Sequence, residues 1–135
     1  MDYEKYIKFE QRLAEKYPKM FPRGGVGSVG EGWWPVLEAL CAQIDHYVTW
    51  QNEQKEKYGR GVGCPTVVVV QIKEKFGGLR FYYDGGNDKV DGMVRMAESW
   101  AAHSCEECGR PGTRRNTGWI KTLCDEHHKQ HGGQN

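Results

Sequence analysis

The chain has 135 residues, 38% of them hydrophobic and 27% charged, with seven tyrosines, five tryptophans and four phenylalanines. This length suits one folded domain, and the aromatic content excludes a disordered chain. Lys and Arg total 19 against 18 for Asp and Glu, so the formal charge of +1 excludes general attraction to a polyanion. No segment has the apolar length of a membrane span or signal peptide, and we expect a soluble protein of the cytoplasm.

Two helices are predicted in the first half of the chain. The first covers residues 3–17, starts after the capping residue Asp2 and stops at Pro18. The second covers residues 35–58, from Pro35 to the terminating Gly59, and is the predicted scaffold. The expected apolar stripe of the first helix is Tyr3, Tyr6, Ile7, Leu13, Ala14 and Tyr17, and one face of the second helix is expected to run through Leu37, Leu40, Cys41, Ile44, Val48 and Gln51.

A β-hairpin and a third helix follow. Residues 66–72 and 79–84 have strand-like composition and are predicted to pair antiparallel. The third helix begins near Asp88 and leads into Cys105. The fold class is therefore α+β: two N-terminal helices, a hairpin, a third helix and a C-terminal zinc knuckle. The expected inward residues are Val68, Val70, Ile72, Leu79, Phe81 and Tyr83 of the hairpin, and Val90, Met93, Val94, Ala97, Trp100 and Ala101 of the helix.

Four potential metal ligands lie in two pairs near the C-terminus. They are Cys105 with Cys108, and Cys124 with His127. Thiolate and imidazole ligands at such short spacings predict one tetrahedral zinc ion, and four protein ligands leave no position for a reacting water, so the zinc is structural. His128 or, less well, His131 could replace His127, and the alternative is that the cysteines are unrelated.

The zinc ligands also set the expected domain organisation. Residues 1–104 form the α+β core, residues 105–131 a zinc lobe packed on it, and residues 132–135 a disordered tail. The remaining cysteines, Cys41 and Cys64, are expected to be reduced thiols.

No set of catalytic residues is visible. A zinc deaminase requires His-x-Glu with Pro-Cys-x-x-Cys, but Cys105 stands two residues after His103 and no proline precedes the cysteine pair. A His-Asn-His nuclease requires a histidine between the ligand pairs, and residues 109–123 contain none. We therefore expect a protein that is not an enzyme.

A glycine-rich loop leads into the second helix. Residues 18–34 contain five glycines, and all five lie between Arg23 and Trp33. Backbone amides at a helix N-terminus suit a phosphate, and Trp33 or Trp34 is suited to stack on a base. The alternative is a flexible loop with both tryptophans in the core.

The hairpin offers a second candidate surface. On an alternating strand, Arg80 and Tyr82 share the face opposite Leu79 and Phe81, and Lys75 lies near them. Arg23, Trp33, Trp34, Lys75, Arg80 and Tyr82 are therefore the candidate ligand-binding residues. The alternative is an ordinary solvated strand face.

A family resemblance rests on three strings. Lys73-Glu-Lys-Phe-Gly-Gly-Leu-Arg-Phe-Tyr82, followed by a helix, Cys105-Glu-x-Cys-Gly and Leu123-Cys-x-x-His127, resembles small zinc-knuckle proteins of tailed phages and prophages. The resemblance covers about residues 66–128. It implies expression in the cytoplasm of a bacterial host and an accessory role.

These observations favour a non-enzymatic binding protein. The leading hypothesis is a phage accessory protein that sequesters a small nucleotide-like molecule, cyclic or linear, such as a signal of host defence. The first alternative is a protein-interaction module that inhibits a host factor. The second is a nucleic-acid-binding zinc module, which strong salt dependence of binding would distinguish.

Overall fold

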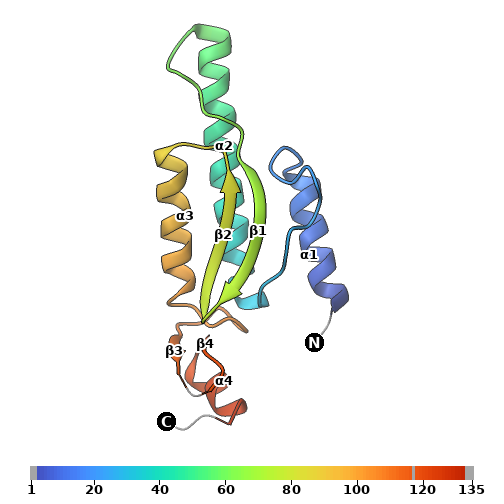
Figure 1. Ribbon diagram of the computed structural model, residues 1–135, viewed down its shortest axis with the longest axis vertical. Coiled ribbons are helices and arrows are strands. Elements are labelled where there is room, and N and C mark those ends of the chain that lie inside the picture. The colour runs from blue at the N-terminus through green and yellow to red at the C-terminus, as the bar shows by residue number, and fades with distance from the viewer. Residues whose placement is uncertain (1–2, 117, 133–135) are drawn as a thin grey trace.

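The computed structural model describes residues 3–116 and 118–132, so Asp2 and residues 133–135 of the predicted tail lie outside the described residues. Helices and a two-stranded antiparallel hairpin confirm the α+β fold (Figure 1). The elements are α1 (Tyr3–Lys16), a 3-10 turn η1 (Glu31–Trp33), α2 (Trp34–Tyr58), β1 (Val68–Lys75), β2 (Gly78–Asp84), α3 (Asp88–Ala101), β3 (Thr113–Arg115), β4 (Lys121–Leu123) and α4 (Asp125–Gln130).

Helix α1 contacts the core through a stripe that the sequence pattern placed in part, since Leu13 and Tyr17 are buried and Tyr6 and Ala14 pack against the core. The buried residues are Phe9 and Leu13, and the Phe9 ring stacks on that of Trp34 with centroids 4.4 Å apart. Tyr3 and Ile7, both predicted to be buried, are exposed. Ile7 precedes Phe9 by two residues and therefore lies about 160° round the helix axis from it.

Helix α2 is the scaffold, as predicted. Its buried residues all lie between Trp34 and Ile44, and the helix ends at Gly59 in the left-handed conformation. Its C-terminal end projects beyond the other elements (Figure 1). Among the described residues, no helix combines the length and apolar character needed to cross a membrane.

The hairpin lies on α2 and α3 with one face inward (Figure 1). Val69 pairs with Tyr83 and Gln71 with Tyr82, so Val70 is the extra residue of a β-bulge. The bulge changes which residues face inward: Val67, Val69 and Ile72 are buried, whereas the predicted Val70 is exposed. The inward positions of Leu79 and Phe81 are confirmed.

Both long edges of this hairpin are covered. The N–H of Ile72 donates to the carbonyl of Val26 in the glycine-rich loop, at 3.0 Å. On the other edge, the N–H of Phe81 donates to the Glu98 carboxylate of α3, also at 3.0 Å. A two-stranded sheet is marginal alone, and here the glycine-rich loop stabilises one edge and α3 the other.

Helix α3 begins one residue after Asn87, whose side chain accepts hydrogen bonds from the N–H groups of Lys89 and Val90. Its buried side runs through Val90, Val94, Ala97 and Ala101. Trp100, predicted to be buried, is 53% exposed, because it lies about 100° round the helix from Ala101.

Replacing Phe81 with alanine tests the position of the hairpin in the core. Phe81→Ala is expected to lower the free energy of unfolding by about 3–5 kcal/mol, the usual cost of truncating a buried phenylalanine. Urea denaturation measures it, with the exposed neighbour Tyr82→Ala as control. A loss below about 1 kcal/mol for Phe81→Ala would place this residue outside the core.

Candidate metal centre and ligand cleft

The four predicted metal ligands lie together. The ligand atoms of Cys105, Cys108, Cys124 and His127 are all within 4.8 Å of one another. The sulfurs of Cys108 and Cys124 are 3.8 Å apart, and Nδ1 of His127 is 3.6 Å from the sulfur of Cys105. Sulfurs bound at about 2.3 Å to one tetrahedral ion are also about 3.8 Å apart. The cluster therefore has the dimensions of a metal site.

Local backbone structure brings the two ligand pairs together. Cys105 and Cys108 stand on a tight turn in which the N–H of Gly109 donates to the carbonyl of Cys105 at 2.9 Å. Strands β3 and β4 then form a short hairpin that returns the chain to Cys124. Cys124 caps α4, so its sulfur and His127, three residues later, lie on the first turn of that helix.

The arrangement shows which histidine lies with the three cysteines, a choice that the sequence left open. His127 belongs to the cluster, whereas His128 is buried on another side of α4 and His131 pairs with Glu107 at 2.8 Å. The hydrogen bond with Cys124 is the main reason that the pKa of His127 is raised in the absence of a metal ion.

Arg110 supports the thiolate form of the cluster. Its Nε donates to the sulfur of Cys108 at 3.3 Å, and its Nη2 donates to the sulfur of Cys124 at 3.7 Å and to Glu126 at 2.6 Å. Burial opposes ionisation of Cys108, but hydrogen bonds, chiefly those from Arg110, outweigh it and lower its pKa to about 6. A low thiol pKa favours metal binding because the ligand is the thiolate.

The two other cysteines lie in a different environment. Cys41 and Cys64 are both buried and free. Burial is the main cause that raises the pKa of Cys41 to about 12, with Asp45 and Glu38 adding to it. Thiols of this kind are inert packing groups.

The metal lobe, which we define as residues 105–131, is joined to the core by hydrogen bonds. Glu106 is buried, and its carboxylate accepts from the N–H of Thr122 at 2.6 Å, while its carbonyl accepts from the N–H of Gly32 at 2.8 Å. The hydroxyl of Thr122 donates to the carbonyl of Gly77 at the hairpin tip, at 2.6 Å. The lobe therefore contacts both η1 and the hairpin.

The tryptophan pair is part of this framework, which overturns its predicted role in ligand binding. Trp33 is 0% exposed, and its indole N–H donates to the carbonyl of Ser104 at 2.9 Å. Trp34 is buried against Phe9, and its N–H donates to the carbonyl of Val29 at 3.0 Å. Neither indole has a face for a base, because both are buried in the main core.

The glycine-rich loop also serves packing. A Cβ on Gly27 would collide with the carbonyl oxygen of Ile72 in β1, and one on Gly32 would collide with the carbonyl oxygen of Cys105. The N–H of Gly27 already donates to the Glu10 carboxylate at 2.9 Å. These glycines allow close backbone approach, and the amides at Gly27 and Gly32 are not available to a phosphate.

The remaining predicted ligand residues lie on open surface. Arg23, Lys75, Arg80 and Tyr82 are exposed, and Arg80 and Tyr82 share the outer face of β2 as expected. The structure does not bring them together with the tryptophan pair.

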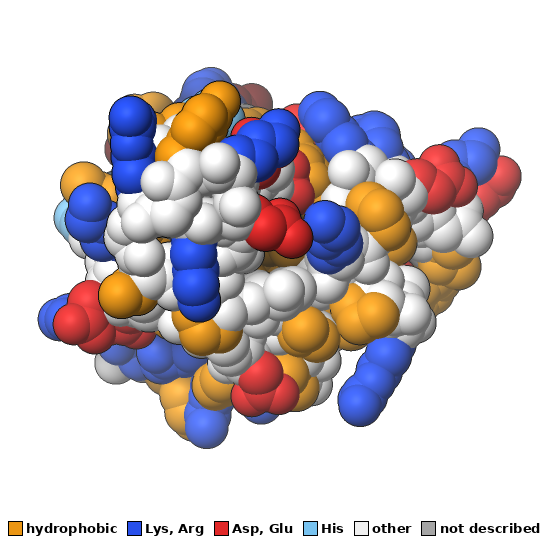
Figure 2. Space-filling model, turned by 90° about the horizontal axis from the view of Figure 1, so that it is seen from above, with side chains coloured by type: hydrophobic (Ala, Val, Ile, Leu, Met, Phe, Trp, Pro, Cys, Tyr) orange, Lys and Arg blue, Asp and Glu red, His pale blue; other side chains and the backbone are white. Residues whose placement is uncertain are grey.

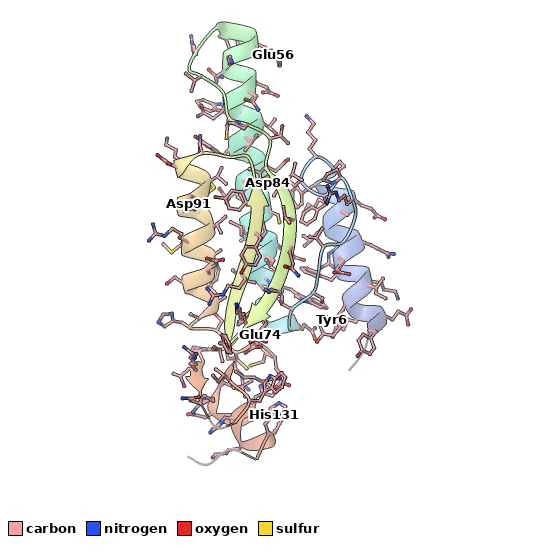
Figure 3. All side chains as sticks on the ribbon, viewed as in Figure 1. Tyr6, Glu56, Glu74, Asp84, Asp91 and His131 are labelled. Atoms are coloured by element: carbon pink, nitrogen blue, oxygen red, sulfur yellow. The ribbon has the colours of Figure 1, made fainter. Side chains whose placement is uncertain are left out.

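A cleft of about 690 Å³, which the sequence did not predict, lies where the lobe meets α1, the glycine-rich loop and the hairpin tip. Figure 3 labels Tyr6, Glu74 and His131, which line it from α1, β1 and the segment after α4. Its walls combine aromatic and charged side chains. They include Tyr3, Tyr6 and Trp119, the cations Arg115 and Lys121, and the carboxylates Glu74, Glu106 and Glu107.

Trp119 is the most conspicuous of these residues. Its side chain is 79% exposed in the loop between β3 and β4, and it lines the cleft. In the sequence, Trp119 is an isolated tryptophan among polar residues of the lobe. This pattern does not indicate which distant residues lie opposite it in the cleft. None of the predicted ligand residues lines this cleft.

Comparison with known proteins gives no relative: no family model, no curated protein and no solved structure matches the chain.

The contacts of Arg110 generate a pH prediction. Metal binding requires thiolates. Because the pKa of Cys108 is lowered, its thiolate persists to lower pH, and the metal stays bound until Cys108 is protonated. Arg110→Ala removes the donor that lowers this pKa, and metal release on acidification is expected to occur at higher pH. Titration with a chromophoric chelator measures it. The control is Arg114→Ala, which removes a cation with no contact to a cluster sulfur among the described residues. Equal midpoints for both variants would contradict this role of Arg110.

Proposed function

We propose that the protein is a non-enzymatic binding protein in which a structural zinc ion holds one wall of a ligand cleft. The single observation that carries this proposal is the composition of the cleft. It places aromatic rings, cations and carboxylates around a volume of about 690 Å³, which lies within the roughly 300–1,000 Å³ typical of small-molecule sites.

Zinc is the metal that the ligand set favours. Three thiolates and one imidazole at tetrahedral spacing are typical of structural zinc. With four protein ligands, zinc binding contributes directly to folding of the lobe. The lobe needs this contribution because, among its described residues, the separate cluster of buried apolar side chains is Cys105, Leu123 and Cys124.

A nucleotide-like molecule is the ligand class that the cleft suits. The rings of Trp119 and Tyr3 offer stacking surfaces for a base. Lys121 offers a cation for a phosphate, and the carboxylate of Glu107 offers an acceptor for N–H groups of a base. A ligand with both a planar ring and a charged group would use each kind of residue.

The resemblance to phage proteins extends this proposal to a biological role. A phage accessory protein that binds a nucleotide and leaves it unchanged would sequester it, and a nucleotide signal of host defence is the ligand such a protein would remove. A protein partner that occupies the same cleft is the alternative.

The metal assignment predicts one zinc ion per purified chain by elemental analysis. His127→Ala is expected to weaken zinc binding strongly, since it removes one of four ligands, whereas the matched His128→Asn should retain it. Competition with a chromophoric chelator compares the two affinities. A different stoichiometric metal would contradict zinc, and loss of affinity only in His128→Asn would contradict the ligand assignment.

Replacing Trp119 tests the ligand cleft. Isothermal calorimetry against linear and cyclic nucleotides is expected to find one that binds and that is recovered unchanged after release by heat. Trp119→Ala should weaken it about tenfold, the order expected for loss of one stacked base. Trp100→Ala is the matched control, because this exposed tryptophan of α3 does not line the cleft.

Two results would contradict the proposal. No binding at high micromolar concentration across the panel would exclude a nucleotide and favour a protein partner. A ligand recovered in cleaved form would show that the protein is an enzyme.

A further inference from the structure

The outer face of the β1–β2 hairpin carries a cluster of three positive charges. Lys73, Lys75 and Arg80 lie on the face of the ribbon opposite the core, and Lys73 pairs directly with Arg80 across the strands. No ion pair of the described residues includes any of these three side chains. They are therefore available to anions from outside.

This charge is local. Over the whole chain 19 cationic side chains face 18 acidic ones, and Figure 2 shows both signs spread over one end of the molecule with hydrophobic side chains between them. On the outer face of the hairpin, the acidic residue is Asp84, at the end of β2 farthest from the tip. Glu74 belongs to the opposite face, where it pairs with the buried Leu79.

Two aromatic rings accompany the cations. The ring of Tyr82 is on the outer face, and the Nζ of Lys73 lies 5.8 Å from its centre. The ring of Phe76 is at the tip, and the Nζ of Lys75 lies 5.9 Å from its centre. Tyr82 is 44% exposed and Phe76 59%. The surface thus repeats one unit, a ring beside an ammonium group, along the ribbon.

The backbone at the tip holds Phe76 in an unusual conformation. Phe76 and Gly77 both have positive φ, 52° and 78°, as the two-residue turn of a type I′ hairpin requires. Asparagine or glycine is the usual residue at the first position, because a bulky side chain is strained there. The phenylalanine therefore costs stability in exchange for an exposed ring, which favours a role in contact.

We propose that this outer hairpin face, defined as Lys73, Lys75, Phe76, Arg80 and Tyr82, binds single-stranded nucleic acid. Arg80 and Tyr82 are exposed on the strand, where an extended ligand can lie along the ribbon, and at the tip Lys75 and Phe76 line a hollow of about 270 Å³. Lys73 and Lys75 are two residues apart on one strand, about 6.6 Å, so successive phosphates of an extended strand can meet successive cations.

The exposed rings of Tyr82 and Phe76 favour a single strand over a duplex, and nucleic acid over an acidic protein. Unpaired bases expose their faces and stack on aromatic side chains, but a duplex hides those faces within its own stack. An acidic protein would satisfy the cations and would have no particular use for Tyr82. The combination of cations and exposed rings thus favours a single strand.

Fluorescence anisotropy with a labelled thymidine oligonucleotide and the full-length, metal-loaded protein tests this proposal. Three phosphate contacts predict a slope of about −2 for log affinity against log salt, so binding should weaken about 20-fold between about 50 and 200 mM salt. Arg80→Ala should reduce this loss to about sevenfold by removing one contact. Tyr82→Ala should weaken binding about fivefold or more through loss of a stacked base.

Matched variants separate this face from the rest of the surface. Arg95→Ala and Trp100→Ala, both of α3, are expected to bind the oligonucleotide like the unsubstituted protein. The duplex of the same oligonucleotide should bind more weakly than the single strand.

Three outcomes would overturn the proposal. The first is absence of binding at low salt, and the second is an equal effect of Arg80→Ala and Arg95→Ala. The third is that polyglutamate competes as strongly as unlabelled oligonucleotide while Tyr82→Ala has no effect. The last would assign the face to an acidic protein partner.

Discussion

Close backbone approach at the junction between the core and the metal lobe is the constraint on which the rest of this structure depends. Gly32 allows η1 to reach the carbonyl of Cys105, and its N–H bonds to Glu106 of the lobe. Gly77 allows the hairpin tip to reach Thr122 in the same way. Because side chains are absent at Gly32 and Gly77, the lobe approaches closely enough to form these hydrogen bonds, and its orientation sets the width of the cleft beside it.

This junction explains why two adjacent tryptophans have structural roles. Successive residues at the start of a helix point in directions about 100° apart, so Trp33 and Trp34 cannot serve the same contact. Trp33 is directed to Ser104 before the lobe, and Trp34 is directed to Phe9 of α1. Each seals one junction of the core. Their adjacency in the sequence suggested a pair of stacking rings, but burial in two directions removes both from the surface.

The sequence predicted what depends on short-range pattern. Ligand spacing identified Cys105, Cys108 and Cys124, and glycine and proline positions located the limits of α2, because both signals act within a few residues. It could not predict the bulge at Val70, since an extra strand residue is defined only by its partner strand. It missed the cleft for a related reason: Tyr6, Glu74 and Trp119 are brought together by lobe docking, from positions 113 residues apart at the extremes.

The cleft and the outer hairpin face differ in what holds them. Trp119 and Lys121 of the cleft belong to the lobe, which has little apolar core apart from its metal ligands. Arg80 and Tyr82 stand on β2, whose inward residues Leu79 and Phe81 belong to the main core. Loss of the metal would therefore dismantle one wall of the cleft, because metal binding is coupled to folding of the lobe. Arg80 and Tyr82 of the outer hairpin face would keep their support from the main core, whereas Lys75 and Phe76 at the tip border Trp119 of the lobe, so the two surfaces meet at the hairpin tip.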